Sequence, residues 1–493
     1  MLLERKKADP EGSFESAKRL SLRDPAGNLY EIDGRLFRVL KQTTSDCFAE
    51  IQSSFGTKKL IQESKLIDSR RLSPAETSSV LKSLSEAGIS PSYTVGSIYE
   101  HRKLDFVSYP HEWCREMLRD AGLLTIEIAE ELLKYNLGLK DGTPFNILFD
   151  SYKPIFVDAL SLEQRSPRDP MWLAYGQFCK TFVNTFMLSR SFKTPFEPNF
   201  YFHRDGMPIK KVYSLLSLQQ KMLPPFLGSV TLPALFSRIH KPTNLDIYQP
   251  KQVSEEAARF ILQNLFKRLR KSLTSGKAQE TNKISQKYMQ IDLPYSQEEF
   301  SEKSQIVESI LRSHNDPRVL DVGCNTGHFS KLAAMNGKSV VAIDSDSDVI
   351  DALYLNAKRE KLNILPVFMD ITNPTPATGW ESSETSSFLA RAHGKFDTVL
   401  MLAVVHHLMT THAIPLEAIA SLAAKLTKKW LVIEYISPED PVFTQLAHGR
   451  DYSMMNKEFF EATFGKLFTI EQTFPLKNQS RTLYLLKKSS YVR

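Results

Sequence analysis

Two glycines stand between an apolar run and a helical pattern in residues 319–330, VLDVGCNTGHFS. Glycine is needed where a ligand lies against the backbone, because a side chain would occupy the ligand's place. The start of the helix adds free backbone N–H groups beside that ligand. Asp344 ends the next apolar run, SVVAID, and an acid there can accept hydrogen bonds from both ribose hydroxyls of an adenosine. These features predict a site for an adenosine-containing cofactor.

The spacing of the acid and the glycines separates two classes of cofactor. A nicotinamide-binding domain is expected to show GxGxxG. Here Asp321, Gly323 and Gly327 form DxGxxxG, with the acid inside the strand. This form resembles motif I of the class I methyltransferases that depend on S-adenosyl-L-methionine (SAM). The alternatives are a dinucleotide site and an α/β core without a ligand.

The resemblance implies SAM as the cofactor. Asp321 and Gly323 would approach its methionine end, and Asp344 would hold its ribose. The implied cofactor-binding residues, of which the last two would lie beside the adenine, are Asp321, Gly323, Asn325, Gly327, Asp344, Asp370 and Ile371. The chain departs from many relatives at Cys324-Asn325, where they carry a further glycine, but asparagine tolerates left-handed backbone angles.

Two adjacent histidines follow the apolar run Phe396–Leu402. In an open α/β sheet, ligands bind beyond the carboxyl ends of the strands, so His406 and His407 are placed where a methyl acceptor should lie. An oxygen or nitrogen acceptor must lose a proton, and histidine titrates near neutral pH. We predict that one of them is a catalytic base. The alternative is that they only shape the pocket or cap a helix.

Two further features lie near this end of the sheet. Glu434 ends the fifth apolar run, where it could bind the acceptor, orient a histidine or be a satisfied polar strand end. The connection between Asp370 and Phe396 is long, and long insertions often cover active sites. We interpret it as a possible acceptor lid, with a decorated surface loop as the alternative; the residues of interest in it are Trp380, Glu381, Phe388 and Arg391.

The elements that position these residues alternate between short apolar strands and helices, which indicates a parallel sheet. At the end of the chain two strands separated by PLKNQS predict an antiparallel hairpin. The resemblance implies a Rossmann-like, seven-stranded methyltransferase sheet, an α/β fold. The predicted strands are 318–322, 339–344, 363–370, 396–402, 430–436, 468–473 and 481–486, and the predicted helices are 327–336, 348–361 and 416–426.

The first half of the chain has a mixed pattern. Residues 28–40 predict a hairpin turned at Asp33-Gly34, and residues 113–139 predict one long helix. Short strands are predicted at 147–149 and 155–157, a helical stretch at 172–190 and an amphipathic helix at 255–269.

A second constellation lies in residues 140–160, KDGTPFNILFDSYKPIFVDAL. Asp141, Asn146 and Asp158 are spaced as in the catalytic loops of kinase-like phosphotransferases, where such residues orient the acceptor hydroxyl and hold magnesium. The match is partial, because Ala-Leu follows Asp158, no glycine-rich loop is evident, and Lys41 and Lys59 are weak candidates for a phosphate lysine. Three interpretations stay open: a degenerate kinase-like α+β domain used for binding, an active kinase, and coincidence in an unrelated fold.

The whole chain also resembles a bacterial family of two-domain, methyltransferase-like proteins, some of which are named for nodulation. Stretches such as SYPHEW (108–113), WLAYGQF (172–178) and the HHL segment carry this resemblance. It implies an acceptor that is a glycan- or lipid-linked small molecule, without identifying one.

Composition sets the remaining expectations. The length of 493 residues suggests two or three domains: a kinase-like domain at 1–271, a polar linker at 272–290 and a methyltransferase domain at 291–493. A net charge of +7 over this length does not indicate a nucleic-acid partner. Four scattered cysteines indicate neither a metal site nor a disulfide framework. Without an apolar signal core or a membrane-spanning run, we expect a cytoplasmic protein.

Three functions follow as hypotheses. The first is a SAM-dependent methyltransferase whose N-terminal domain recruits or positions the acceptor. The second is a bifunctional small-molecule kinase and methyltransferase. The third is a non-enzymatic module whose kinase-like half binds a partner.

Overall fold

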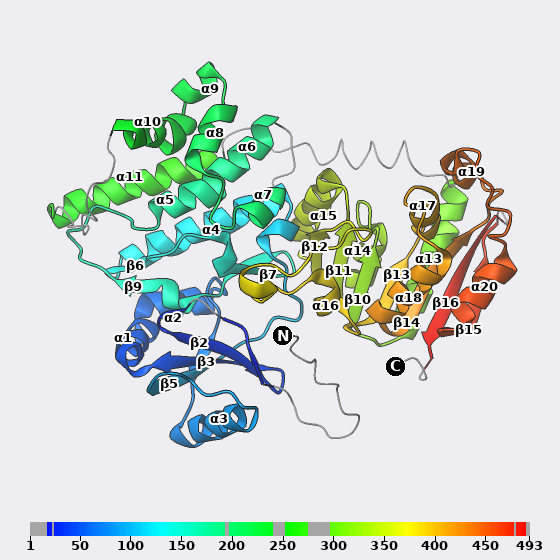
Figure 1. Ribbon diagram of the computed structural model, residues 1–493, viewed down its shortest axis with the longest axis horizontal. Helices are drawn as coiled ribbons and strands as arrows, with labels where there is room; N and C mark the ends of the chain where they lie inside the picture. The colour runs from blue at the N-terminus through cyan, green and yellow to red at the C-terminus, as the bar shows by residue number, and fades with distance from the viewer. Residues whose placement is uncertain are drawn as a thin grey trace, which may run out of the picture. The chain divides into compact units, whose positions relative to one another are not determined.

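A computed structural model describes residues 17–21, 24–192, 197–239, 252–274, 296–477 and 480–489 (Figure 1). The chain divides into two compact units, Met1–Leu104 and Asp105–Arg493. The helix that precedes the predicted linker, α11 (Glu255–Thr274), extends to Thr274. The rest of that linker and the first residues of the predicted methyltransferase domain lie outside the described residues, so those domain boundaries stay a prediction.

The first unit is built on an antiparallel sheet in the order β1-β2-β3-β5-β4. The predicted hairpin is confirmed: β2 and β3 pair around Asp33 and Gly34, which both have positive φ, as a tight two-residue turn requires. The elements of this unit are β1 (Lys18–Arg19), β2 (Gly27–Ile32), β3 (Arg35–Lys41), α1 (Gln42–Ser53), α2 (Phe55–Gln62), β4 (Ser69–Arg71), α3 (Pro74–Glu86) and β5 (Val95–His101).

The second unit begins with a long buried helix, α4 (Arg115–Leu133). The prediction of one helix over 113–139 was wrong at its end: Asn136 turns the chain with a φ of 57°, and β6 (Leu137–Leu139) pairs with β9 (Leu162–Gln164). The two predicted strands between them are confirmed as the hairpin of β7 (Ile147–Asp150) and β8 (Lys153–Phe156).

Helices make up the next part of this unit. The predicted helical stretch at 172–190 is confirmed, with a π-helical segment Cys179–Val183 in its middle. The helices here are α5 (Tyr175–Phe178), α6 (Asn184–Phe192), α7 (Glu197–Phe202), α8 (Ile209–Leu215), α9 (Leu218–Met222), α10 (Leu232–Ile239) and α11.

The C-terminal part is a seven-stranded sheet in the order β12-β11-β10-β13-β14-β16-β15. Five strands are parallel, and β16 and β15 are antiparallel, so the predicted α/β sheet with a terminal hairpin is confirmed. The strands are β10 (Arg318–Val322), β11 (Ser339–Asp344), β12 (Ile364–Phe368), β13 (Phe396–Met401), β14 (Thr427–Ile436), β15 (Phe468–Pro475) and β16 (Arg481–Lys488).

Helices connect and flank these strands (Figure 1). They are α13 (Gln297–Ser313), α14 (His328–Met335), α15 (Ser347–Glu360), α16 (Phe388–Ala392), α17 (Val405–Thr410), α18 (Leu416–Leu426), α19 (Pro441–Ala447) and α20 (Lys457–Gly465). The chain runs outward in opposite directions from β10 and β13, which pair with each other. The carboxyl ends of these two strands therefore form the switch point at which such sheets bind ligands.

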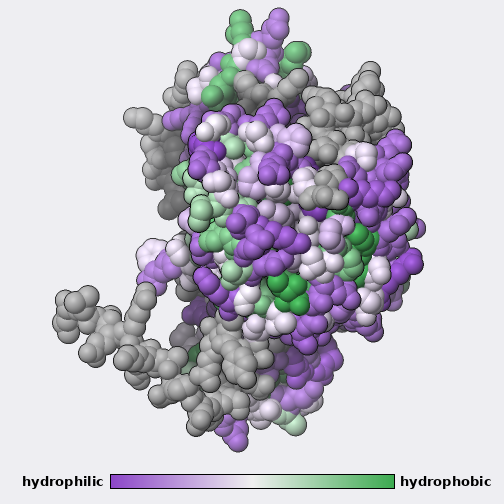
Figure 2. All heavy atoms as spheres, turned by 90° about the vertical axis from the view of Figure 1, so that its right-hand side faces the viewer, coloured by the Kyte–Doolittle hydropathy of each residue, from purple (hydrophilic) through white to green (hydrophobic). Residues whose placement is uncertain are grey.

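The outer edge of the sheet is polar. β15 pairs only with β16 among the described strands, and most of its residues are exposed. From the side of β15 and α20, the surface in Figure 2 is largely hydrophilic with small, separate hydrophobic patches. Polar side chains on an edge strand oppose further strand pairing.

The long connection between β12 and β13 is tethered to residues 106–112. The guanidinium of Arg391 pairs with the fully buried carboxylate of Glu112 and lies 4.8 Å from the ring centroid of Tyr109. Thr375 Oγ1 donates to the same Glu112 carboxylate at 2.5 Å, and Phe388 packs edge-on against Phe106. These contacts tether both ends of the connection to residues 106–112, while Trp380 and Glu381 between them are exposed and their role in an acceptor lid stays a prediction.

A second contact joins α4 to α15 through buried charges. Arg115 lies 3.2 Å from Asp348 and 3.3 Å from Asp351. One carboxylate oxygen of Asp120 accepts from Tyr354 Oη at 2.7 Å and also pairs with the ammonium of Lys358. Because α15 directly follows the strand that ends at Asp344, this contact supports the predicted cofactor edge from outside.

The Glu112→Gln variant tests the tether. Glutamine preserves the shape of the side chain but leaves the buried guanidinium of Arg391 without its carboxylate. Breaking a buried ion pair by removing one partner costs about 3–5 kcal/mol, so we expect a clearly lower midpoint of chemical denaturation. The matched control is Glu298→Gln, which removes an exposed ion pair with Lys477 and should leave the midpoint unchanged. Equal midpoints for the wild type and Glu112→Gln would contradict the tether.

Candidate functional site

The turn from β10 into α14 is closed so tightly that it requires glycine. Gly323 and Gly327 have φ values of +69° and +84°, which L side chains rarely adopt. A Cβ at Gly323 would lie 2.6 Å from Val404 Cγ2, and one at Gly327 would lie 2.3 Å from Leu353 Cδ1. Asn325, at a φ of 48°, does adopt the left-handed conformation expected of the residue that stands in place of a glycine.

Asp344 closes this turn from the end of β11. Its Oδ2 accepts the backbone N–H of Asn325 at 2.9 Å, and its Oδ1 accepts that of Asp346 at 3.0 Å. An ionised carboxylate has about four lone-pair positions, so two remain for ligand hydroxyls. Burial raises the pKa of Asp344, and the backbone N–H groups of Asp346, Asn325 and Ser345 oppose that shift. The residues therefore fit a ribose.

Asp321 lies deeper, inside β10, and is 2% exposed. The Ser330 hydroxyl on α14 donates to its Oδ2 at 2.6 Å. Burial, aided by the nearby charge of Asp344, raises the pKa of Asp321 to about 6. A buried acid at the switch point suits a ligand that brings its own positive charge, because the pairing offsets the cost of burying the carboxylate.

Asp370 and Ile371 follow β12 at the same edge of the sheet, and both are half-buried. Asp370 Oδ1 accepts from the backbone N–H of Thr372 at 2.8 Å and from its hydroxyl at 2.6 Å. Asp370 thus shapes its own loop, and its second carboxylate oxygen is the atom left for a ligand. The structure brings the acids of β10, β11 and β12 to one edge, as the sequence predicted.

A buried cluster of charges lies beside this edge and was missed by the sequence reasoning. Lys303 on α13 donates to Glu434 Oε2 at 2.7 Å, and both side chains are almost fully buried. Arg481 donates to both carboxylate oxygens of Asp440, at 2.8 and 3.0 Å, and its Nη1 lies 4.0 Å from Glu434 Oε1. Of the three roles considered for Glu434, this geometry supports the satisfied polar strand end.

The two histidines lie on the short helix α17 and differ in environment. His406 is 4% exposed, and its Nδ1 has no hydrogen-bond partner among the described residues. Burial and, to a smaller extent, the neighbouring His407 lower the pKa of His406 to about 3. His407 is exposed, with its ring centroid 4.2 Å from that of His406. Only the exposed histidine can exchange a proton with solvent directly.

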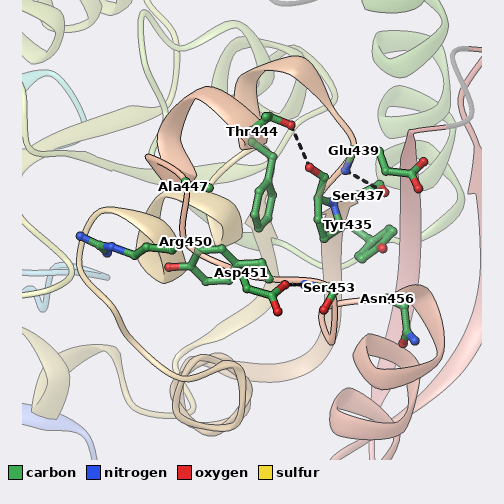
Figure 3. A pocket seen from close by; sticks show the side chains of 13 residues that line it. Tyr435, Ser437, Glu439, Thr444, Ala447, Arg450, Asp451, Ser453 and Asn456 are labelled. Atoms are coloured by element: carbon green, nitrogen blue, oxygen red, sulfur yellow. Dashed lines mark hydrogen bonds between the residues drawn. The ribbon is translucent and has the colours of Figure 1, made fainter.

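A cavity of about 440 Å³ opens beyond the carboxyl end of β14 (Figure 3). Its walls come from Tyr435, α19 and residues 449–456 before α20. One wall, Phe443, stacks near His406 at a centroid distance of 6.4 Å. The cavity is built from loops far along the chain from the cofactor motif, and the sequence reasoning did not find it.

The second predicted constellation also converges. Ser161, fully buried after β8, lies within hydrogen-bonding distance of all three predicted side chains. Its hydroxyl is 2.7 Å from Asp158 Oδ2, 3.4 Å from Asp141 Oδ2 and 2.9 Å from Asn146 Nδ2. Burial and the charge of Asp158 raise the pKa of Asp141. In the described ranges, no group of three or more His, Cys, Asp or Glu side chains is arranged to hold a metal ion.

The two candidate phosphate lysines, Lys41 and Lys59, both contact neighbouring residues of the first unit. Lys41 Nζ lies 5.4 Å from the ring centroid of Tyr93, and Lys59 lies one helical turn from Glu63.

The four cysteines, including Cys324 in the cofactor turn, are free thiols. No helix of the described residues is long and apolar enough to cross a bilayer.

Sequence comparisons agree with this geometry. A family model described as "Methyltransferase domain" matches residues 252–472. The chain is 28% identical over 478 residues to the nodulation protein NoeA of Rhizobium meliloti (strain 1021), with 95% of each chain covered.

Structural comparisons give lower overall similarity. The N-methyltransferase NodS from Bradyrhizobium japonicum WM9 is 15% identical, with a TM-score of 0.30, and covers 40% of this chain and 99% of its own. The magnesium protoporphyrin IX methyltransferase ChlM from Synechocystis PCC 6803, crystallised with SAM, is 20% identical, with a TM-score of 0.30, and covers 44% and 100%.

The family match, the sheet order and the glycine turn agree on one conclusion. The C-terminal part of the chain is a methyltransferase domain, and its cofactor is SAM.

Asp321 gives a prediction about stability. Its pKa of about 6 in the folded protein exceeds the ordinary value of 3.8, so folding binds its proton more tightly. The tighter proton binding of Asp321 stabilises the folded protein below pH 3.8, and this stabilisation is lost as the pH rises to about 6. Above that pH, burying the charged carboxylate costs up to about 3 kcal/mol. Asp321→Asn, whose amide oxygen can still accept from Ser330, should therefore be more stable than the wild type at pH 8.

The difference should shrink as the pH falls toward 4, and denaturant midpoints across this range measure it. Asp451→Asn is the control, because Asp451 is exposed and its backbone hydrogen bond from Ser453 lowers its pKa. A lower midpoint for Asp321→Asn at pH 8, or a difference independent of pH, would contradict the assignment.

Proposed function

We propose that this protein transfers the methyl group of SAM to a small-molecule acceptor bound beyond the carboxyl ends of β13 and β14. The observation that carries the proposal is the closed glycine turn with Asp344 at its rim, where two lone-pair positions remain for ribose hydroxyls. Asp321 would face the charged methionine end, and Asp370 with Ile371 would border the adenine. SAM supplies an activated methyl group, and the chain's own residues determine where the acceptor can approach it.

Packing contacts support an acceptor position on the cavity side. Val404, which limits the space at Gly323, directly precedes α17. Two residues later His406 lies against Phe443, which lines the cavity. The first turn of α17 therefore separates the cofactor turn from the cavity and contacts both. An acceptor held in the cavity would reach the cofactor past α17.

We also propose that one of the two histidines takes the acceptor's proton. His407 is the stronger candidate because it is exposed, whereas a pKa of about 3 makes His406 a weak base at neutral pH. In that case His406 would shape the pocket and position its neighbour. The similarity to NoeA, named for nodulation, supports a glycan- or lipid-linked acceptor as the class to test.

A second candidate function concerns residues 105–271. The convergence of Asp141, Asn146 and Asp158 on Ser161, with the β7–β8 hairpin between the last two, supports a kinase-like site. Phosphoryl transfer depends on positioning and charge neutralisation, and no glycine-rich loop is evident. We therefore propose that this part binds or positions the acceptor and turns over little or no ATP.

Calorimetric titration tests the cofactor site. The wild type should bind SAM but not NAD⁺. Asp344→Ala should weaken SAM binding about 10–100-fold, because charge-assisted hydrogen bonds contribute about 1.5–3 kcal/mol. The control is Glu298→Ala, which removes an exposed carboxylate that pairs with Lys477 and does not border the cofactor turn. Unchanged affinity in Asp344→Ala would overturn the ribose assignment, and absence of SAM binding by the wild type would overturn the methyltransferase proposal.

Titration with Mg-ATP separates the three functional hypotheses. SAM binding alone supports the methyltransferase with a binding domain, whereas binding of both ligands supports the bifunctional enzyme. If neither binds, the non-enzymatic module is favoured. Sustained ATP turnover that Asp158→Ala abolishes, with SAM affinity unchanged, would replace the proposed binding role by a kinase.

The histidine hypothesis is tested by transfer of labelled methyl groups from SAM to the small-molecule fraction of a bacterial extract. If one histidine is the base, its Ala variant should lose roughly 10²–10⁴-fold in rate with SAM affinity nearly intact. His412→Ala, in an exposed position just after α17, controls for nonspecific effects. Full activity in both His406→Ala and His407→Ala would exclude a histidine base.

A further inference from the structure

The cavity beyond β14 combines aromatic walls with a polar rim. Phe443 and Tyr452 meet edge to face at a centroid distance of 5.4 Å, and Tyr435 adds a third ring. The hydroxyls of Tyr435 and Tyr452 donate to the backbone carbonyls of Met455 and Met409, each at 3.1 Å. Phe443 and Tyr435 are almost fully buried, so the half-buried ring of Tyr452 is the aromatic surface that a ligand can contact, with Phe443 packed behind it.

The polar groups around the rings are mainly hydrogen-bond acceptors. Glu439 and Asp451 are exposed carboxylates, and Asp451 is held by the backbone N–H of Ser453 at 2.8 Å. Arg450 donates to the carbonyl of Thr410 at 3.0 Å, and Figure 3 shows its side chain extending away from Asp451. The rim therefore carries two carboxylates and one guanidinium, with serine hydroxyls and the amide of Asn456 beside them.

This combination restricts the chemistry of the ligand. The two carboxylates outnumber the one guanidinium and so disfavour an anion, and a hydrocarbon chain would make no hydrogen bonds with the polar rim. A sugar ring suits both the aromatic wall and the polar rim of the cavity. Its C–H face packs on aromatic carbons, and its hydroxyls donate to carboxylates and form hydrogen bonds with hydroxyls and amides. The volume of about 440 Å³ falls within the range of small-molecule sites, about 300–1,000 Å³.

We infer that the cavity binds a sugar ring of the methyl acceptor. This inference rests on the proposed function for its biological meaning, but binding of the sugar can be measured without SAM. Tyr452 forms the stacking surface, with the buried ring of Phe443 behind it, while Glu439 and Asp451 accept hydrogen bonds from the sugar hydroxyls. Because the Tyr452 hydroxyl donates to Met409 on α17, a sugar on this ring would lie beside α17.

Saturation-transfer NMR with methyl β-D-glucoside, methyl β-D-glucosaminide and N-acetylglucosamine tests the inference on the full-length protein. We expect transfer to ring protons of at least one sugar, with affinity weakened about tenfold in Asp451→Asn and in Glu439→Gln. Tyr452→Leu should remove the stacking surface and also weaken binding. The matched controls outside the cavity are Glu381→Gln for the carboxylates and Trp380→Leu for an exposed aromatic ring.

SAM affinity, measured on the same variants, reports folding and separates the two proposals. Sugar binding that the rim variants weaken while SAM affinity holds supports the inference. The inference is wrong if the wild type binds SAM but none of the three sugars, or if none of the rim variants changes sugar binding. It is also wrong if the protein binds tetramethylammonium and no sugar, which would indicate a cation site. Loss of SAM binding in the wild type would count against the proposed function and not against the sugar site.

Discussion

The turn between β10 and α14 has no room for a side chain at either of its glycines, and this limits how the neighbouring elements of the methyltransferase domain can pack. A side chain at Gly323 would displace Val404, and one at Gly327 would displace Leu353. Leu353 belongs to α15, which follows Asp344, and Val404 precedes the helix of the two histidines. The two glycines therefore set how closely α15 and the start of α17 approach the turn. Buried Leu353 and half-buried Val404 leave no room for a side chain at either glycine.

The same edge is also held from residues outside the sheet. Thr375, five residues after Asp370, donates its hydroxyl to Glu112 and its backbone N–H to Met369 Sδ at 3.5 Å. The loop that would border the adenine is thus fixed at its start by Asp370 itself and at its far end by the segment before α4. Because Glu112 is fully buried and also binds Arg391, the loop and the first part of the second unit are expected to move together. A partner or ligand on residues 105–271 could influence SAM binding through this connection.

Local patterns predicted most of the sheet and the cofactor turn, because the strands are short apolar runs and the turn needs glycine where it occurs. The end of α4 was mispredicted because KYNLGL keeps a helical spacing of apolar residues, while Asn136 leaves the helix with a positive φ. The charge cluster could not be predicted, since Lys303 pairs with a residue 131 positions away. The cavity was missed for a similar reason: its rings and carboxylates are scattered between β14 and α20, where no periodic pattern marks a shared surface.

The buried charges bear on how a proton could leave the acceptor. Burial is the main reason that the charged form of His406 is disfavoured, and the charges of Arg481 and Lys303 add to it, whereas Asp440 opposes them. An imidazolium at His406 would therefore add a cation to a region where burial already opposes charge. Partial burial also lowers the pKa of His407, but its side chain reaches solvent, whereas that of His406 does not. A proton taken by His407 could pass to solvent, while His406 stays neutral and packs against Phe443. The electrostatics thus separates two adjacent, chemically identical side chains into a candidate base and a candidate spacer.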